Sequence, residues 1–269
     1  MPYFRSDGLN IYYEIEGSGS EVVMIHGFSS NLEGGWKQAG MAAALRSENR
    51  LIMMDCRGHG KSDKPYEPAM YGASMLNDII NLMDHLNIEK ANFLGYSMGS
   101  GLSMNTLLTR PERVKSIILG GYGADPTATP TAVAETARRP VRVDALLAED
   151  PEQIADPESK AYRLRVEARG GDLKALAAVQ MGNTANPVAK LIDPATRLER
   201  IKAISVPLMT VLGSDDGPPG DKSRLAMLVP QGCHFQISGR NHLSTVPDPR
   251  FHMAVRGFLM YVNSRQALQ

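Results

Sequence analysis

The chain has 269 residues, enough for one large domain or for one domain that carries an insertion. Its 29 basic and 29 acidic residues give a formal net charge of zero, so nothing in the composition argues for nucleic acid or an anionic membrane as a partner. No run approaches the roughly 18 apolar residues of a membrane span, and the N-terminus lacks the apolar core of a signal peptide. We therefore expect a cytoplasmic protein, with a homo-oligomer left open.

Short apolar runs alternate with helical patterns along the chain. An antiparallel hairpin is expected over residues 3–15, because Asp7-Gly8 separates two short runs. The continuously apolar runs that follow are typical of parallel strands covered on both faces. They span residues 21–26, 50–55, 91–94, 114–120, 207–212 and 233–238. Apolar residues at three- and four-residue spacing predict helices over 75–83 and 251–262. This order predicts an α/β, doubly wound architecture.

One long segment, residues 124–202, interrupts the alternation. It contains no convincing strand, and its helical patterns are punctuated by prolines and glycines. A long irregular connection is the alternative, but loops of this length without structure are uncommon. We expect an inserted helical lid at 124–202, over a core formed by residues 1–123 and 203–269. This segment is called the predicted lid below.

The two cysteines, Cys56 and Cys233, lie in or beside apolar runs. Two cysteines do not make a disulfide framework. Both are expected to be buried free thiols.

The most informative motif is the pentapeptide Gly-Tyr-Ser-Met-Gly at residues 95–99. It follows an expected strand and precedes an expected helix, which is the context of a nucleophile elbow. A turn this sharp strains the serine and requires small residues two positions away. Ser97 is therefore the candidate nucleophile, at the N-terminus of a helix whose free N–H groups favour a developing negative charge.

A serine nucleophile requires a base within hydrogen-bond reach and a third group that orients the base. His242 follows the last expected strand, and loops after parallel strands share one edge of the sheet. His242 is therefore the candidate base. Asp215 and Asp216 follow the preceding expected strand, and Asp125 follows the one before that. Spacing alone does not choose between these acids.

Acyl transfer also requires hydrogen-bond donors for the developing oxyanion. The backbone N–H of Met98, directly after the nucleophile, is one candidate. The N–H of Phe28 is the second, because Gly27 lets the loop after the first long strand turn in closely. His26 and His59 also lie in loops after strands, but their glycine neighbours favour a structural role.

Several motifs together resemble the α/β-hydrolase superfamily. The resemblance covers nearly the whole chain outside the predicted lid and has the family's order of Ser, Asp and His. It is carried by the segments 23–28, 55–65, 95–99, 213–216 and 241–242. It implies a mostly parallel sheet of the eight-stranded type and selects Asp216 over Asp215, because the acid follows a glycine by three positions. It also implies that Arg57 and Asp63 brace a loop structurally.

The leading hypothesis is a serine hydrolase that cleaves a small carboxylic ester through an acyl-enzyme. Lactone hydrolysis and cleavage of a C–C bond beside a ketone use the same triad in similar family members. A small-molecule receptor or signalling protein of the same fold is an alternative from another class. No cofactor motif and no cluster with metal-ligand spacing occurs, so neither cofactor nor metal is expected.

Overall fold

The computed structural model describes residues 2–123, 142–185, 187, 191–217 and 222–266. One sheet of eight strands runs through the molecule in the order β1-β2-β4-β3-β5-β6-β7-β8. The first two strands pair antiparallel, as does β2 with β4, and all the other pairs are parallel. The strands are β1 (Tyr3–Ser6), β2 (Leu9–Glu16), β3 (Ser20–Ile25), β4 (Asn49–Met54), β5 (Ala91–Tyr96), β6 (Val114–Gly120), β7 (Leu208–Gly213) and β8 (Gly232–Ile237). The predicted fold class is confirmed, and so is the hairpin at one sheet edge.

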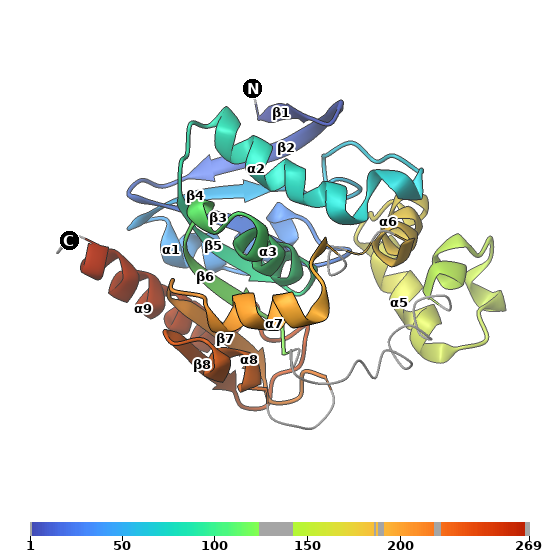
Figure 1. The fold of residues 1–269 in the computed structure, drawn as a ribbon. Helices are drawn as coiled ribbons and strands as arrows, with labels where there is room; N and C mark the ends of the chain where they lie inside the picture. The colour runs from blue at the N-terminus through green and yellow to red at the C-terminus, as the bar shows by residue number, and fades with distance from the viewer. Residues whose placement is uncertain (1, 124–141, 186, 188–190, 218–221, 267–269) are drawn as a thin grey trace.

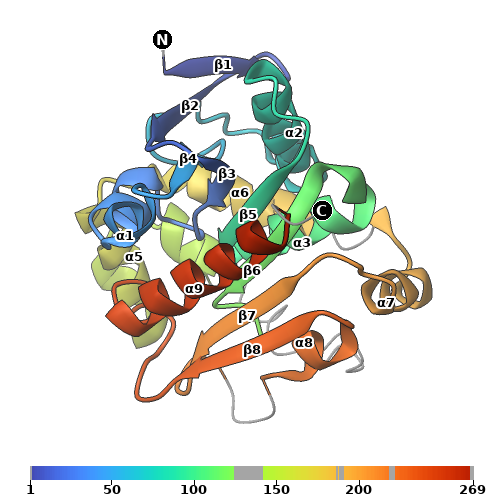
Figure 2. The ribbon, with the colours of Figure 1, turned by 90° about the vertical axis from the view of Figure 1, so that its left-hand side faces the viewer.

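The helices cover both faces of this sheet (Figures 1 and 2). The short α1 and the long C-terminal α9 lie on one face, and α2, α3 and α7 lie on the other. The described helices are α1 (Met41–Leu45), α2 (Met75–His85), α3 (Met98–Thr109), α5 (Pro157–Ala168), α6 (Leu173–Ala185), α7 (Pro194–Lys202), α8 (Arg224–Leu228) and α9 (Pro249–Gln266), with a further helix at 142–147. No described helix is long and apolar enough to cross a membrane.

Two separate layers of core result from the period-two alternation of the strands. Along β3, Val23 and Ile25 pack into the layer beneath α2 and α3. Val22 and Met24 point to the opposite layer, beneath α1 and α9. All four side chains are fully buried, which explains why the strand is continuously apolar in sequence.

The chain reverses direction across the sheet between β3 and β5. From β3 it crosses to β4 on one side, then returns to β5 on the other, so β3 lies between the two. Ile25 and Gly95 are opposite one another at the carboxyl ends of β3 and β5. Ligands of open α/β sheets bind at such a switch point, because the loops diverge there and leave a crevice.

Helices α5 and α6, within the predicted lid, lie at one end of the sheet (Figure 1). Leu146, Val166, Leu176 and Ala177 form a small apolar cluster of their own, and Phe28 of the sheet domain packs against it. Helix α6 also contacts the loop between β4 and α2, where a Cβ on Gly182 would collide with the Pro68 carbonyl oxygen.

Helix α7, the last part of the predicted lid, packs instead on α3 of the sheet domain. Arg197 donates to Asn105 Oδ1 at 2.7 Å, and Arg200 donates to the Leu108 carbonyl at 2.8 Å. Ile201 is buried in the core beneath α3. The exact extent of the predicted lid stays a prediction, and these contacts join α7 to the sheet domain.

The two cysteines differ in burial. Cys56 is a buried free thiol as predicted, and burial raises its pKa. The prediction for Cys233 is wrong, because Cys233 is free but exposed. It lies on β8, the last strand of the sheet, which has a neighbouring strand on one side only.

A buried ion pair braces the loop after β4. Arg57, fully buried, donates two hydrogen bonds of 2.7 Å to the carboxylate of Asp78 on α2. It also donates to the Met70 carbonyl at 2.7 Å and to Asp7 at 3.0 Å. Asp63 accepts the backbone N–H of Asn10 at 2.7 Å, which ties the same loop to β2. These contacts fit the structural role implied for Arg57 and Asp63.

Asp78→Asn should lower the free energy of unfolding by about 3 kcal/mol, because it removes the buried partner of Arg57 and leaves only the half-exposed Asp7 as a counter-charge. Urea unfolding followed by circular dichroism measures this loss. Asp84→Asn is the matched control, since Asp84 pairs with Arg113 at 2.7 Å but is 60% exposed. That change should cost at most about 1 kcal/mol. Equal losses in the two variants would contradict the bracing role of Asp78.

Candidate active site

Ser97 lies at the tip of a sharp turn between β5 and α3. Its backbone has φ 54° and ψ −111°, a conformation that a non-glycine residue rarely adopts. Its N–H donates to the Gly120 carbonyl at 2.8 Å, which fixes the turn to β6. A side chain at Gly99 would collide with the Ile25 carbonyl oxygen, and one at Gly95 would collide with the backbone at Gly99. The two glycines thus allow the close approach that the strained turn requires.

His242 lies between Ser97 and Asp216. Its Nε2 is 2.9 Å from Ser97 Oγ, and its Nδ1 is 2.9 and 3.0 Å from the two carboxylate oxygens of Asp216. An ionised carboxylate only accepts hydrogen bonds, so Nδ1 carries the proton and Nε2 accepts the Ser97 hydroxyl. This arrangement leaves the serine proton directed at a base, as general-base activation requires.

The backbone around His242 is held by Tyr96, the variable residue of the elbow. The Tyr96 hydroxyl donates to the His242 carbonyl at 2.6 Å, and the two rings are 5.3 Å apart. A Cβ on Gly121 would come within 3.0 Å of His242 Cε1. This role of Tyr96 is not predicted by the sequence. The motif requires only a variable residue there, so the sequence carries no signal for it.

The two neighbouring aspartates have different surroundings. Asp216 is 9% exposed and faces His242, whereas the carboxylate of Asp215 accepts the hydroxyl of Ser214 at 2.8 Å. The backbone N–H of Asp215 donates to the Arg240 carbonyl at 2.9 Å. The structure thus places Asp216, as the family resemblance implied, next to His242. The third candidate, Asp125, lies outside the described residues.

Of the two predicted oxyanion donors, Met98 follows the nucleophile in the chain, and Phe28 lies in a loop beside it. Met98 is the first residue of α3, where backbone N–H groups lack helical acceptors. A Cβ on Gly27, just before Phe28, would lie 3.4 Å from Ser97 Cβ, so this loop runs directly beside the serine. Within the described part of the chain, neither the Phe28 nor the Met98 N–H has a hydrogen-bond acceptor. Their role as donors stays a prediction.

A cavity of about 630 Å³ opens onto Ser97 and His242. Its walls come from the loop after β3, from the end of α5 and from the loop after β8. Its apolar lining residues include Phe28, Trp36, Leu243 and Val246. Arg169 lines the cavity on the side formed by the predicted lid. This volume is within the range of small-molecule sites.

His26 lines this cavity, and the ring of His59 lies 5.1 Å from the His26 ring. The His26 Nδ1 hydrogen donates to the Gly27 carbonyl at 2.8 Å, and its Nε2 accepts the Cys56 N–H at 3.0 Å. Burial lowers the pKa of both histidines, that of His59 to about 3, with the nearby His26 ring adding to the effect. Both imidazoles are therefore neutral in the folded protein.

Among the described residues, no group of three or more His, Cys, Asp or Glu side chains is placed to hold a metal ion.

Comparison with known proteins agrees with this geometry. The family model of the alpha/beta hydrolase fold matches residues 22–148. An esterase from Thermogutta terrifontis superposes with a TM-score of 0.75 at 23% identity, over 97% of each chain. An enol-lactonase from Burkholderia xenovorans superposes with a TM-score of 0.68 at 24% identity, over 96% of this chain and 100% of the other.

The chain has the α/β-hydrolase fold. Among curated relatives, the 2-hydroxy-6-oxo-6-phenylhexa-2,4-dienoate hydrolase of Comamonas testosteroni is 34% identical over 119 residues. The match covers 42% of this chain and 41% of that protein, so the chain spans less than half the length of this curated relative.

Asp216→Asn should slow the labelling of Ser97 by a fluorophosphonate by about four orders of magnitude, because the amide leaves His242 in the wrong tautomer. Asp215→Asn is the matched control and should label at nearly the wild-type rate, since its carboxylate contacts Ser214. Labelling reactions quenched at successive times and analysed by intact-protein mass spectrometry measure both rates. The reverse ranking would show that Asp216 does not orient the base.

The free energy of unfolding should fall as the pH is lowered from 7 to 4. The unfolded state binds a proton on His59 below about pH 6.5, whereas the folded state stays neutral until about pH 3. His59 alone should therefore contribute a loss on the order of 3 kcal/mol over this range. Urea unfolding at several pH values measures it, with His59→Gln as the non-titrating comparison. Parallel curves for the two proteins would contradict the neutral state of His59.

Proposed function

We propose that this chain is a serine hydrolase that cleaves small carboxylic esters through an acyl-enzyme. The observation that carries the proposal is a pair of hydrogen bonds, both of 2.9 Å. One joins Asp216 to His242, and the other joins His242 to Ser97. The strained backbone at Ser97, the adjoining cavity and the esterase among the structural matches support it.

In the proposed mechanism, Ser97 Oγ attacks the ester carbonyl carbon while His242 Nε2 takes the hydroxyl proton. The carbonyl oxygen becomes an oxyanion and accepts hydrogen bonds from the N–H groups of Phe28 and Met98. Asp216 holds the imidazole in its reactive tautomer and stabilises the imidazolium. His242 then gives its proton to the departing alkoxide, and the alcohol leaves.

The second half of the reaction reverses these roles. A water molecule loses a proton to His242 Nε2 as its oxygen attacks the acyl-enzyme carbonyl. Collapse of this second tetrahedral intermediate breaks the bond to Ser97 Oγ, which regains the proton from His242. A carboxylic acid and the free enzyme result. Each step uses groups of the protein and water alone.

The walls of the cavity are expected to select the substrate. The sheet domain supplies the proposed nucleophile, base, acid and oxyanion donors, whereas the end of α5 supplies a wall at Ala168 and Arg169. We therefore assign water exclusion and substrate positioning to the predicted lid. The cytoplasmic location and a homo-oligomer stay predictions from the sequence.

Lactones and vinylogous diketones are the alternative substrate classes for the same proposed triad. The names of the Burkholderia enol-lactonase and of the Comamonas hydrolase support including both classes as alternatives. A receptor or signalling protein would differ from all of these in turnover. It would be acylated once and would lose the acyl group very slowly.

Purified protein should hydrolyse short-chain esters with multiple turnovers, and Ser97→Ala should lose that activity while it keeps its fold. The serine hydroxyl is the atom that bonds to the acyl carbon, so its removal leaves no nucleophile. Spectrophotometric assay of short-chain esters, lactones and vinylogous diketones measures turnover, and peptide mapping after phosphonate treatment locates the label. Activity that persists in Ser97→Ala would overturn the nucleophile assignment. A single turnover per chain would favour the receptor.

A further inference from the structure

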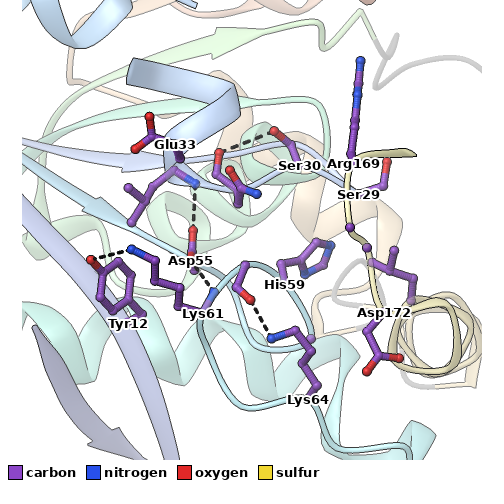
Figure 3. Close-up of a pocket in the computed structure, with 17 residues that line it drawn as sticks. Tyr12, Ser29, Ser30, Glu33, Asp55, His59, Lys61, Lys64, Arg169 and Asp172 are labelled. Carbon is purple, nitrogen blue, oxygen red and sulfur yellow. Dashed lines mark hydrogen bonds between the residues drawn. The ribbon is translucent and has the colours of Figure 1, made fainter. Parts of the chain in front are cut away.

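A second cavity of about 320 Å³ lies beside the one that contains Ser97. It is enclosed by the loop after β3, the loop after β4 and the segment that joins α5 to α6 (Figure 3). The two cavities share five lining residues, which are Ser29, Ser30, Asn31, Glu33 and Arg169. The second cavity is therefore an immediate neighbour of the first.

His59, which lines this second cavity, has a buried hydrogen-bond acceptor without a partner among the described residues. Its Nδ1 lies 3.0 Å from the Arg57 carbonyl oxygen, which can only accept, so Nδ1 carries the ring hydrogen. Nε2 then has a free lone pair. The side chain is 3% exposed, and no described residue donates to Nε2. The neighbouring His26 ring, 5.1 Å away, has the same tautomer but accepts the Cys56 N–H at its Nε2.

A buried acceptor without a donor costs about 1–3 kcal/mol of stability. Protonation does not relieve this cost, because burial keeps His59 neutral. Nε2 therefore calls for a group that donates a hydrogen bond from within the cavity. A carboxylate does not donate and is excluded as the group that contacts it.

Most of the charged side chains around the cavity are already engaged within the protein (Figure 3). Asp55 accepts two backbone N–H groups at 2.7 Å, and Lys64 donates to two backbone carbonyls. Lys61 donates to the Tyr12 hydroxyl, and Asp172 accepts a hydrogen bond from the Tyr66 hydroxyl. The lining carries three acidic and three basic residues, namely Glu33, Asp55 and Asp172 with Lys61, Lys64 and Arg169. This balance favours a neutral ligand over an ammonium or an anion.

Arg169 is the charged side chain that stands at the border of both cavities. It is exposed and makes no hydrogen bond or ion pair with another described residue. Figure 3 shows its side chain extending past Ser29 and away from Lys64. Its guanidinium can therefore donate to an oxygen that passes from one cavity toward the other. A hydroxyl group both accepts from such a donor and donates to His59.

We propose that the second cavity is a subsite for a neutral hydroxyl group at the far end of the substrate. The ester bond lies at Ser97, the chain passes between Ser29 and Arg169, and the terminal hydroxyl donates to His59 Nε2. This inference rests on the proposed ester hydrolysis and narrows its substrate class to hydroxylated esters. No chemical step takes place in the subsite, which acts through binding alone.

The test compares two esters of equal length, hexyl butyrate and its analogue with a hydroxyl in place of the terminal methyl of the hexyl group. A second pair, pentyl heptanoate and its terminally hydroxylated analogue, carries the difference in the acyl part. The ratio of kcat/KM within a pair does not depend on the amount of folded enzyme. We expect wild-type protein to favour the hydroxylated member of at least one pair.

Two substitutions at His59 separate its two nitrogens. His59→Asn places an amide near Nδ1, which keeps a donor for the Arg57 carbonyl and removes the acceptor at Nε2. His59→Gln places an amide near Nε2 and gives up the donor to Arg57. The preference for the hydroxylated ester should fall about five-fold in His59→Asn, as loss of one neutral hydrogen bond implies, and persist in His59→Gln. Thermal unfolding of both variants reports on the fold.

An equal ratio in wild type and His59→Asn would overturn the proposal, because a trapped water would then be the donor to Nε2. If no ester is hydrolysed, the proposed function fails, and the subsite is tested by binding alone. Hexanediol titrated into the wild-type protein should shift the ¹⁵N resonance of His59 Nε2, whereas hexane should not. An unchanged resonance at tens of millimolar diol would overturn the subsite independently of catalysis.

Discussion

The strained turn at Ser97 is the constraint on which the rest of the site depends. A positive φ at a non-glycine residue costs about 1–3 kcal/mol and persists only where its surroundings hold it. Here the Ser97 N–H is fixed to the Gly120 carbonyl, and Gly99 packs against the backbone at the end of β3. Those contacts exist because β5 lies between β3 and β6 in the sheet. The strand order therefore creates the elbow and brings the loops after β3 and β6 to its sides.

The predicted lid is joined to this arrangement through Phe28. The ring of Phe28 stacks on Tyr162 of α5 at 6.4 Å and 13°, and it meets His59 edge-on at 5.7 Å. Phe28 also packs against the apolar cluster within the predicted lid. The residue whose N–H we assign to the oxyanion thus has its side chain held by α5. A shift of α5 would therefore move the side chain of Phe28, which belongs to the loop beside Ser97.

Local patterns in the sequence predicted the strands, the elbow and the position of His242, because each depends on a short segment and on strand order. They did not predict what depends on neighbours across the sheet. Cys233 looks like a core residue in sequence, yet β8 has a strand on one side only. The choice between Asp215 and Asp216 is made by the backbone turn after β7, and spacing alone left it open. Family resemblance supplied that choice, since it carries the turn along with the residues.

The pair of His26 and His59 shows the same limit at the level of single atoms. Both follow a strand, both have a glycine next to them, and both are buried and neutral. In His26 both nitrogens hold the backbone together, so the ring is a structural strut. In His59, which lines the second cavity, one nitrogen does this, and the other is buried without a donor among the described residues. Most buried polar atoms of native proteins have a hydrogen-bond partner. The difference between the two histidines therefore lies in the partner of one nitrogen atom, which short sequence patterns do not determine.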